Sequence, residues 1–172
     1  MTETPAPSRP EPPYAGDEYP TLVGFLEWQR ATFRMKCSGL SPEQLLQRAS
    51  PPSTMCLLGL LRHLSEVEMG WFRSRFADEE VRVLYGDDDA DFNVTEADEE
   101  SVSVAWALYE EQVERAREIV AGAALDDLTI GTTRSGDRPS LRWILVHMIE
   151  EYARHNGHAD LLREAIDGVV GE

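Results

Sequence analysis

Residues 143–168, with the sequence WILVHMIEEYARHNGHADLLREAIDG, predict a long helix. Apolar residues return at every third or fourth position, which is the period of a helix with one buried face. Pro139 lies near the start of this segment and Gly168 lies just past its end, an asymmetry typical of helix boundaries. We therefore expect a helix over about residues 139–166.

Polar residues also repeat along this helix. At 100° per residue, with His147 at zero, Glu151 falls at about 40°, His155 at about 80° and His158 at about 20°. The four side chains therefore form one stripe. Side chains one turn apart lie about 5–6 Å from each other, close enough to share a cation. In a helix bundle such a stripe can point inward and meet a ligand from a facing helix.

Three further segments have helical spacing and complete the expected fold. They cover about residues 21–36, 54–76 and 99–121. A shorter helix start is expected at Ser41-Pro42, with the serine as N-cap. The sequence contains no alternating pattern long enough to predict a strand. It predicts an all-α protein, an up-and-down four-helix bundle over residues 21–172.

Residues 1–20 differ from the rest because they hold six of the ten prolines. Proline lacks an N–H donor, and this segment lacks apolar periodicity, so we expect an extended N-terminal arm. Tyr14 and Tyr19 are the side chains expected to hold the arm against the bundle.

The chain is strongly acidic, with 32 acidic and 16 basic residues and a formal net charge of -16. A nucleic-acid-binding protein needs a concentrated basic face, and no basic run occurs. Nucleic acids and anionic membrane surfaces are therefore not expected as partners. Eleven of the acidic residues fall within residues 78–100. We interpret this segment as a solvated loop, with repulsion of anions or binding of a basic partner as alternatives.

The two cysteines, Cys37 and Cys56, form no C-x-x-C motif and are expected to be buried thiols rather than nucleophiles. No apolar run approaches the ~18 residues of a membrane span, and no leader pattern opens the chain. We expect a cytoplasmic protein with reduced thiols.

All four histidines fall on the helices expected at residues 54–76 and 139–166. Glu151 and His155 form an i,i+4 pair, and His63 can complete a triangle from the facing helix. Two histidines and one carboxylate suit zinc, nickel, cobalt or ferrous iron. Such a cation leaves room for a water or a substrate thiol and lowers its pKa. Without a cation, the pair on one helix would be an ordinary helix-stabilising contact.

Four tryptophans recur at helical core positions, and we expect them to pack in the interior. Trp71 lies two turns after His63, where it can form a wall of the site. The four are Trp28, Trp71, Trp106 and Trp143.

Two stretches carry a resemblance to a known family. LRHLSEVE at residues 61–68, followed by Trp71-Phe72, resembles the second-helix signature of the DinB/YfiT-like superfamily. Residues 143–168 closely resemble the DUF664 branch of that superfamily. The resemblance covers nearly the whole chain after the arm. It implies a four-helix bundle that binds a divalent metal through one residue of its second long helix and two residues of its last.

The common DinB form has histidine at all three ligand positions, whereas Glu151 occupies one of them here. The set His63, Glu151 and His155 is similar to the His-Glu-His set of the mycothiol-dependent maleylpyruvate isomerases. This resemblance implies a divalent metal cofactor, zinc in the first place with nickel or iron as alternatives. It also implies a low-molecular-weight thiol cosubstrate such as mycothiol.

Our hypothesis from the sequence is a metal-dependent thiol S-transferase or isomerase that acts on a small electrophile. His147 and His158 are the catalytic candidates, as proton carriers or orienting groups. The alternative is a non-catalytic metal-binding or stress-response interaction protein. The resemblance also implies a homodimer.

Overall fold

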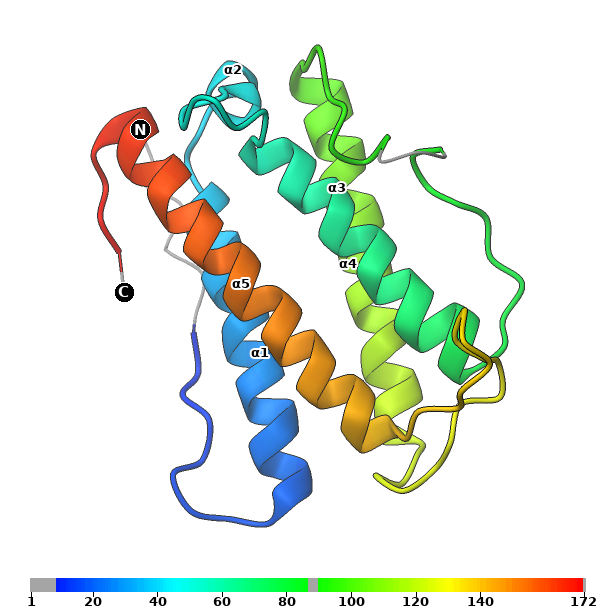
Figure 1. The fold of residues 1–172 in the computed structure, drawn as a ribbon. Coiled ribbons are helices and arrows are strands. Elements are labelled where there is room, and N and C mark those ends of the chain that lie inside the picture. The colour runs from blue at the N-terminus through cyan, green and yellow to red at the C-terminus, as the bar shows by residue number, and fades with distance from the viewer. Residues whose placement is uncertain (1–8, 87–89, 172) are drawn as a thin grey trace.

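Four long helices run up and down the computed structural model, which describes residues 9–86 and 90–171 (Figure 1). A short helix, α2 (Pro42–Leu46), follows the first of them. The described residues form no β-strand, only a single bridge between Leu128 and Ser140. The predicted all-α four-helix bundle is confirmed. Its long helices are α1 (Glu18–Cys37), α3 (Leu57–Glu68) with its π-helical continuation η1 (Met69–Phe76), α4 (Glu99–Ala121) and α5 (Leu141–Asp167).

The helices pack in two principal pairs. α1 lies along α5 and α3 lies along α4, while α3 and α5 also touch across the bundle. Figure 1 shows α3 and α5 crossing the front of the molecule, with α4 and α1 behind them. The facing sides of α3 and α5 are where the sequence predicts the metal ligands. None of the helices in the described part of the chain is long and apolar enough to cross a membrane.

Local sequence signals explain most helix ends. α4 has the predicted bounds, because the Asp98 carboxylate accepts the Ser101 N–H at 2.8 Å and the helix stops at Gly122. α2 has the predicted Ser41 cap, and Gly168 ends α5 in the left-handed conformation that favours glycine.

Three predicted helix starts are wrong. α3 begins at Leu57 rather than at Thr54, with Cys56 as N-cap. α1 begins at Glu18 rather than at Thr21, because Pro20 falls in the first turn, where its missing N–H has no helical partner. α5 begins at Leu141 rather than at Pro139, with Ser140 as N-cap. The arm is held to the bundle by Pro13, which packs on Gly24, whereas Tyr14 is 93% exposed.

The π-helical segment η1 has no counterpart in the sequence prediction. α3 does not end at Glu68 but widens its turns, so that the Ala77 N–H donates to the Phe72 carbonyl five residues back at 3.0 Å. π-helical turns are rare and recur at functional sites. The wider turns change the direction of every side chain from Met69 onward, including Trp71.

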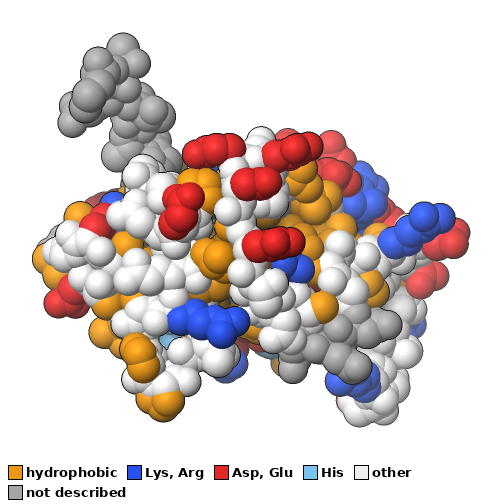
Figure 2. Space-filling view, turned by 90° about the horizontal axis from the view of Figure 1, so that it is seen from above, with side chains coloured by type: hydrophobic (Ala, Val, Ile, Leu, Met, Phe, Trp, Pro, Cys, Tyr) orange, Lys and Arg blue, Asp and Glu red, His pale blue; other side chains and the backbone are white. Residues whose placement is uncertain are grey.

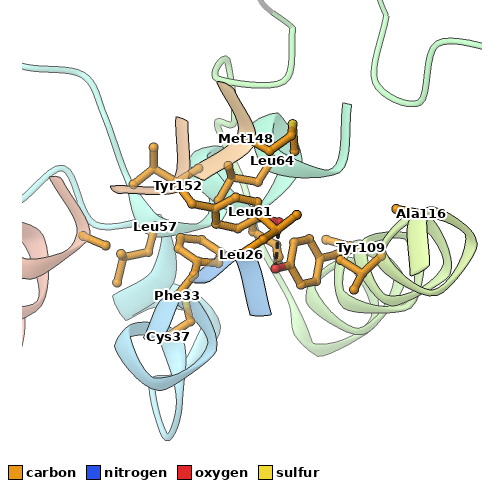
Figure 3. Close-up of a cluster of buried hydrophobic side chains, with 14 of the residues drawn as sticks. Leu26, Phe33, Cys37, Leu57, Leu61, Leu64, Tyr109, Ala116, Met148 and Tyr152 are labelled. Carbon is orange, nitrogen blue, oxygen red and sulfur yellow. Dashed lines mark hydrogen bonds between the residues drawn. The ribbon is translucent and has the colours of Figure 1, made fainter. Parts of the chain in front are cut away.

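Leucines and aromatic rings fill the space between the helices. Figure 3 shows Leu57, Leu61 and Leu64 of α3 facing Phe33 of α1 and Tyr152 of α5. All five are at most 1% exposed, so each contributes about 1.5–3 kcal/mol of apolar burial. The core therefore joins the two helix pairs into one unit.

A buried ion pair crosses this core. Arg30 of α1 donates from Nε and Nη2 to the two carboxylate oxygens of Glu68 at 2.8 and 2.6 Å. The Tyr152 hydroxyl donates to the same carboxylate at 2.7 Å and lies 2.9 Å from the Tyr109 hydroxyl. A hydroxyl has one proton, so Tyr109 donates to Tyr152. The network links all four long helices, and charged residues are this deeply buried only when they are paired.

Trp143 contradicts the prediction that all four tryptophans pack in the interior. Its residue is 48% exposed, while Trp28, Trp71 and Trp106 are partly buried. Trp143 lies in the first turn of α5, where the other helices do not cover the side of α5 that carries it.

Replacing Glu68 by alanine is expected to destabilise the protein by about 3–5 kcal/mol, because it leaves the buried Arg30 charge without its partner. Urea unfolding measures this loss. Glu110→Ala is the control, since it removes the surface partner of Arg34 and should cost about 0–1 kcal/mol. Equal losses in the two variants would contradict the structural role of the buried pair.

Candidate metal centre

His63 of α3 and two residues of α5, Glu151 and His155, meet between the two helices. One ligand atom from each lies within 4.8 Å of the others. His155 Nε2 is 3.4 Å from Glu151 Oε2, and the rings of His63 and His155 meet edge to face at 4.8 Å. The structure therefore brings together the three residues that the sequence singles out as ligands.

The His63 ring is oriented by the acidic loop between η1 and α4. Asp91 Oδ2 lies 2.8 Å from His63 Nδ1, and the Phe92 ring stacks on the imidazole at 4.5 Å. A carboxylate beside Nδ1 keeps the proton on that nitrogen and leaves the Nε2 lone pair free for a metal. This is the carboxylate–histidine arrangement that metal-binding histidines commonly have.

Contacts with α3 hold this loop in place. The Glu66 carboxylate accepts the N–H groups of Leu84 and Tyr85 at 2.7 and 3.0 Å, and Arg62 donates to the Ala90 carbonyl at 2.9 Å. The sequence analysis misses Asp91 because it lies in an acidic run without periodicity, where nothing separates it from its solvated neighbours. Residues 87–89 lie outside the described part of the chain.

His155 is buried and neutral. Burial, together with the nearby His63 and His158, lowers its pKa to about 4. Its Nδ1 lies 3.4 Å from His158 Nδ1, on the side away from Glu151. His158 therefore lies behind the ring of His155, where it can orient that ring, and a cavity of about 170 Å³ opens beside it.

His147 lies one turn before Glu151 on α5. Its Nε2 is 3.7 Å from Glu151 Oε1, and its Nδ1 is 3.9 Å from Glu150 Oε2. The two oxygens of Glu151 thus face different histidines, His155 and His147. Glu150 also pairs with Arg154 at the surface.

The donor set fits a divalent cation. Two imidazole nitrogens and one carboxylate oxygen are ligands of zinc, nickel and ferrous iron, and three protein ligands leave a coordination position for a small molecule. Burial keeps His155 in the neutral form that a metal requires, and Asp91 favours the matching tautomer of His63. A larger cavity of about 530 Å³ lies between the arm and α1, and none of its lining residues belongs to this cluster.

Both protein thiols are buried and face no partner in the cluster. Burial raises the pKa of the Cys37 thiol to about 12, and it also raises the pKa of Cys56. A buried thiol with a raised pKa is a poor nucleophile. A thiol that reacts at this site therefore has to come from a cosubstrate.

Figure 2 shows red carboxylates over the upper part and the sides of the face seen from above, with histidine visible only in small patches. The side chains of His63, Glu151 and His155 are 22%, 16% and 8% exposed, so the cluster is partly covered.

An all-α bundle with a His-Glu-His cluster on facing helices is the arrangement expected of a DinB-like bundle. The family model described as Mycothiol-S-transferase matches residues 21–168, which include all the cluster residues on α3 and α5. The chain belongs to this mycothiol S-transferase family. No curated protein matches it.

Asp91→Ala is expected to lower the affinity for zinc by about 10–100-fold, because the His63 ring loses the carboxylate that fixes its tautomer. Titration of metal-free protein with zinc against a chelator of known affinity measures the change. Glu96→Ala removes an exposed carboxylate from the same loop and should bind zinc like the wild type. If both variants lose affinity equally, the charge of the loop rather than the Asp91 contact is responsible.

Neither cysteine is expected to react with a maleimide at pH 8 in the folded protein, whereas both should react in guanidinium chloride. Mass spectrometry counts the adducts. The reason is the burial that raises the thiol pKa values. Rapid labelling of Cys37 in the native state would contradict its position in the core.

Proposed function

We propose that the protein is a metal-dependent S-transferase that joins mycothiol to a small electrophile. The convergence of His63, Glu151 and His155 within 4.8 Å, in a member of the mycothiol S-transferase family, carries the proposal. The family description favours transfer over isomerisation. Zinc is the cation that we propose for this donor set.

A divalent cation bound by these three residues would lower the pKa of a coordinated thiol and keep it as the thiolate at neutral pH. The protein groups supply the geometry. Asp91 contacts Nδ1 of His63 and His158 contacts Nδ1 of His155, which leaves Nε2 of each ring available to a cation. Ring orientation of this kind reduces the reorganisation needed when the substrates bind.

We assign the proton transfer to His147. The thiol loses its proton to His147 Nε2, which faces Glu151 at 3.7 Å, where a carboxylate stabilises the imidazolium that forms. The sulfur then forms a bond with the electrophilic carbon, and the leaving group departs with the electron pair of the broken bond. His147 returns the proton to the leaving group or to solvent. His158 remains an orienting residue in this scheme.

Tag-free protein, purified without chelator, is expected to contain about one divalent metal per chain and to accelerate the reaction of mycothiol with an alkyl halide. His63→Ala and Glu151→Ala should lose both the metal and the acceleration, because two ligands cannot hold the cation tightly. Elemental analysis and loss of free thiol measure the two effects, and circular dichroism checks the fold.

Glu164→Ala is the matched control, because it removes an exposed carboxylate from the same helix. It should keep the metal and the activity. Full activity in the Glu151→Ala variant, or in wild-type protein after chelation, would overturn the proposed metal-dependent transfer.

A further inference from the structure

Three rings form a continuous aromatic surface beside the metal centre, which we call the aromatic wall: Trp71, Trp143 and His147. The Trp143 ring stacks on His147 at 5.0 Å with an interplanar angle of 21°. Trp71 meets His147 edge to face at 4.7 Å, and it lies tilted against Trp143 at 5.2 Å. η1 supplies Trp71 and α5 supplies the other two rings, so the wall bridges the two helices that carry the ligands.

The wall begins at the cluster itself, because His147 Nε2 lies 3.7 Å from the Glu151 carboxylate. It ends in solvent, because Trp143 is 48% exposed. A large aromatic side chain in contact with water at the edge of a reactive site offers apolar area and a flat stacking face to a ligand. Packing within the core does not account for the half-exposed position of Trp143.

A guanidinium group, that of Arg75, lies beside Trp71, the ring that η1 contributes to the aromatic wall. Arg75 lies over the Trp71 ring at 4.7 Å from its centroid and donates to the Gly70 carbonyl at 2.8 Å. A side chain at Gly70 would place its Cβ 3.0 Å from Arg75 Nη1, so glycine leaves the room that the guanidinium occupies. The π-helical turns thus set Trp71 and Arg75 together.

A second arginine approaches from the loop before α5. The N–H groups of Ile130 and Gly131 donate to the carbonyls of Phe76 and Arg75 at 3.2 and 2.9 Å, which fixes this loop on the end of η1. The charge of Arg134 acts on Arg75 from this loop. Within the described residues neither arginine forms an ion pair, although the chain has a net charge of -16. Two cations without a carboxylate mark a place for an anionic ligand.

We propose that the aromatic wall and Arg75 bind the electrophilic substrate, and that this substrate is a flat aromatic compound with a carboxylate. The inference rests on the proposed S-transferase function. Each group contacts the next in a row that runs in the order Arg75, Trp71, His147 and Glu151. The carboxylate of the substrate pairs with Arg75, its ring lies on the wall, and its reactive carbon points to the Glu151 end, where the thiol is held.

Binding is tested first, without turnover, with 2-naphthoate as the probe and isothermal titration calorimetry or indole N–H shifts in NMR as the readout. Wild-type protein should bind 2-naphthoate at least tenfold more tightly than cyclohexanecarboxylate, which has the charge but no aromatic ring. Trp143→Ala and Arg75→Gln should each weaken naphthoate binding about tenfold or more. Leu161→Ala and Arg48→Gln remove an exposed apolar side chain and an exposed cation elsewhere, and should bind like the wild type.

Turnover is tested next with mycothiol and 4-(bromomethyl)benzoate. Trp143→Ala should raise the KM for the halide about tenfold and leave the KM for mycothiol and kcat close to wild type. A rise in the KM for mycothiol instead would overturn the inference, because the wall would then hold the thiol cosubstrate. Equal binding of naphthoate to the wild type, Trp143→Ala and Arg75→Gln would also overturn it.

The experiments distinguish a failure of the proposed S-transferase function from a failure of the proposed substrate site on the aromatic wall. Variant-sensitive naphthoate binding in a protein that transfers no thiol supports the wall as a ligand site and overturns the S-transferase function. Metal-dependent transfer that is insensitive to both wall substitutions supports the function and overturns the assignment of the wall.

Discussion

The ion pair between Arg30 and Glu68 is the interaction on which the rest of the structure depends. Both side chains are almost completely buried, at 2% and 0% exposure, and removing each charge from water costs several kcal/mol. Only an arrangement that keeps the guanidinium, the carboxylate and the Tyr152 hydroxyl within hydrogen-bond distance is stable. This requirement sets the rotation of α1, α3 and α5 relative to one another, which hydrophobic packing alone leaves adjustable.

The position of the candidate metal centre follows from that rotation. Tyr152 points to Glu68 in the core, and at 100° per residue Glu151 and His155 lie about 100° and about 60° to the same side of it. That side faces α3, where His63 precedes the buried Leu64. The ligands therefore occupy the border of the core, where polar side chains can keep one side open to solvent. Glu68 is also the residue after which the helix widens into η1, so Trp71 of the aromatic wall follows shortly after the buried pair.

Helical periodicity and helix-boundary residues were sufficient to predict the bundle, and the spacing of Glu151 and His155, with the family resemblance, was sufficient to predict that they meet His63. Three features could not be predicted in this way. Asp91 acts through a loop whose path depends on tertiary contacts such as that of Glu66 with the backbone. A π-helical turn leaves no periodic signal, so the widening of the helix that sets Arg75 against Trp71 was hidden, although Trp71 was expected beside the site. The burial of Arg30 runs against the usual exposure of arginine, and only the three-dimensional partner reveals it.

The exposure of the candidate ligands favours the proposed reactive site over a structural one. Structural zinc sites are closed by four protein ligands, whereas catalytic sites keep one position open. Within the described residues this cluster has three ligands, and the side chains of His63 and Glu151 remain 22% and 16% exposed. Glu151 directs one oxygen toward His155 and the other toward His147. In the proposed mechanism the same carboxylate would contact both a bound cation and His147, so the cation that would acidify a thiol and the base that would accept its proton would lie on either side of Glu151.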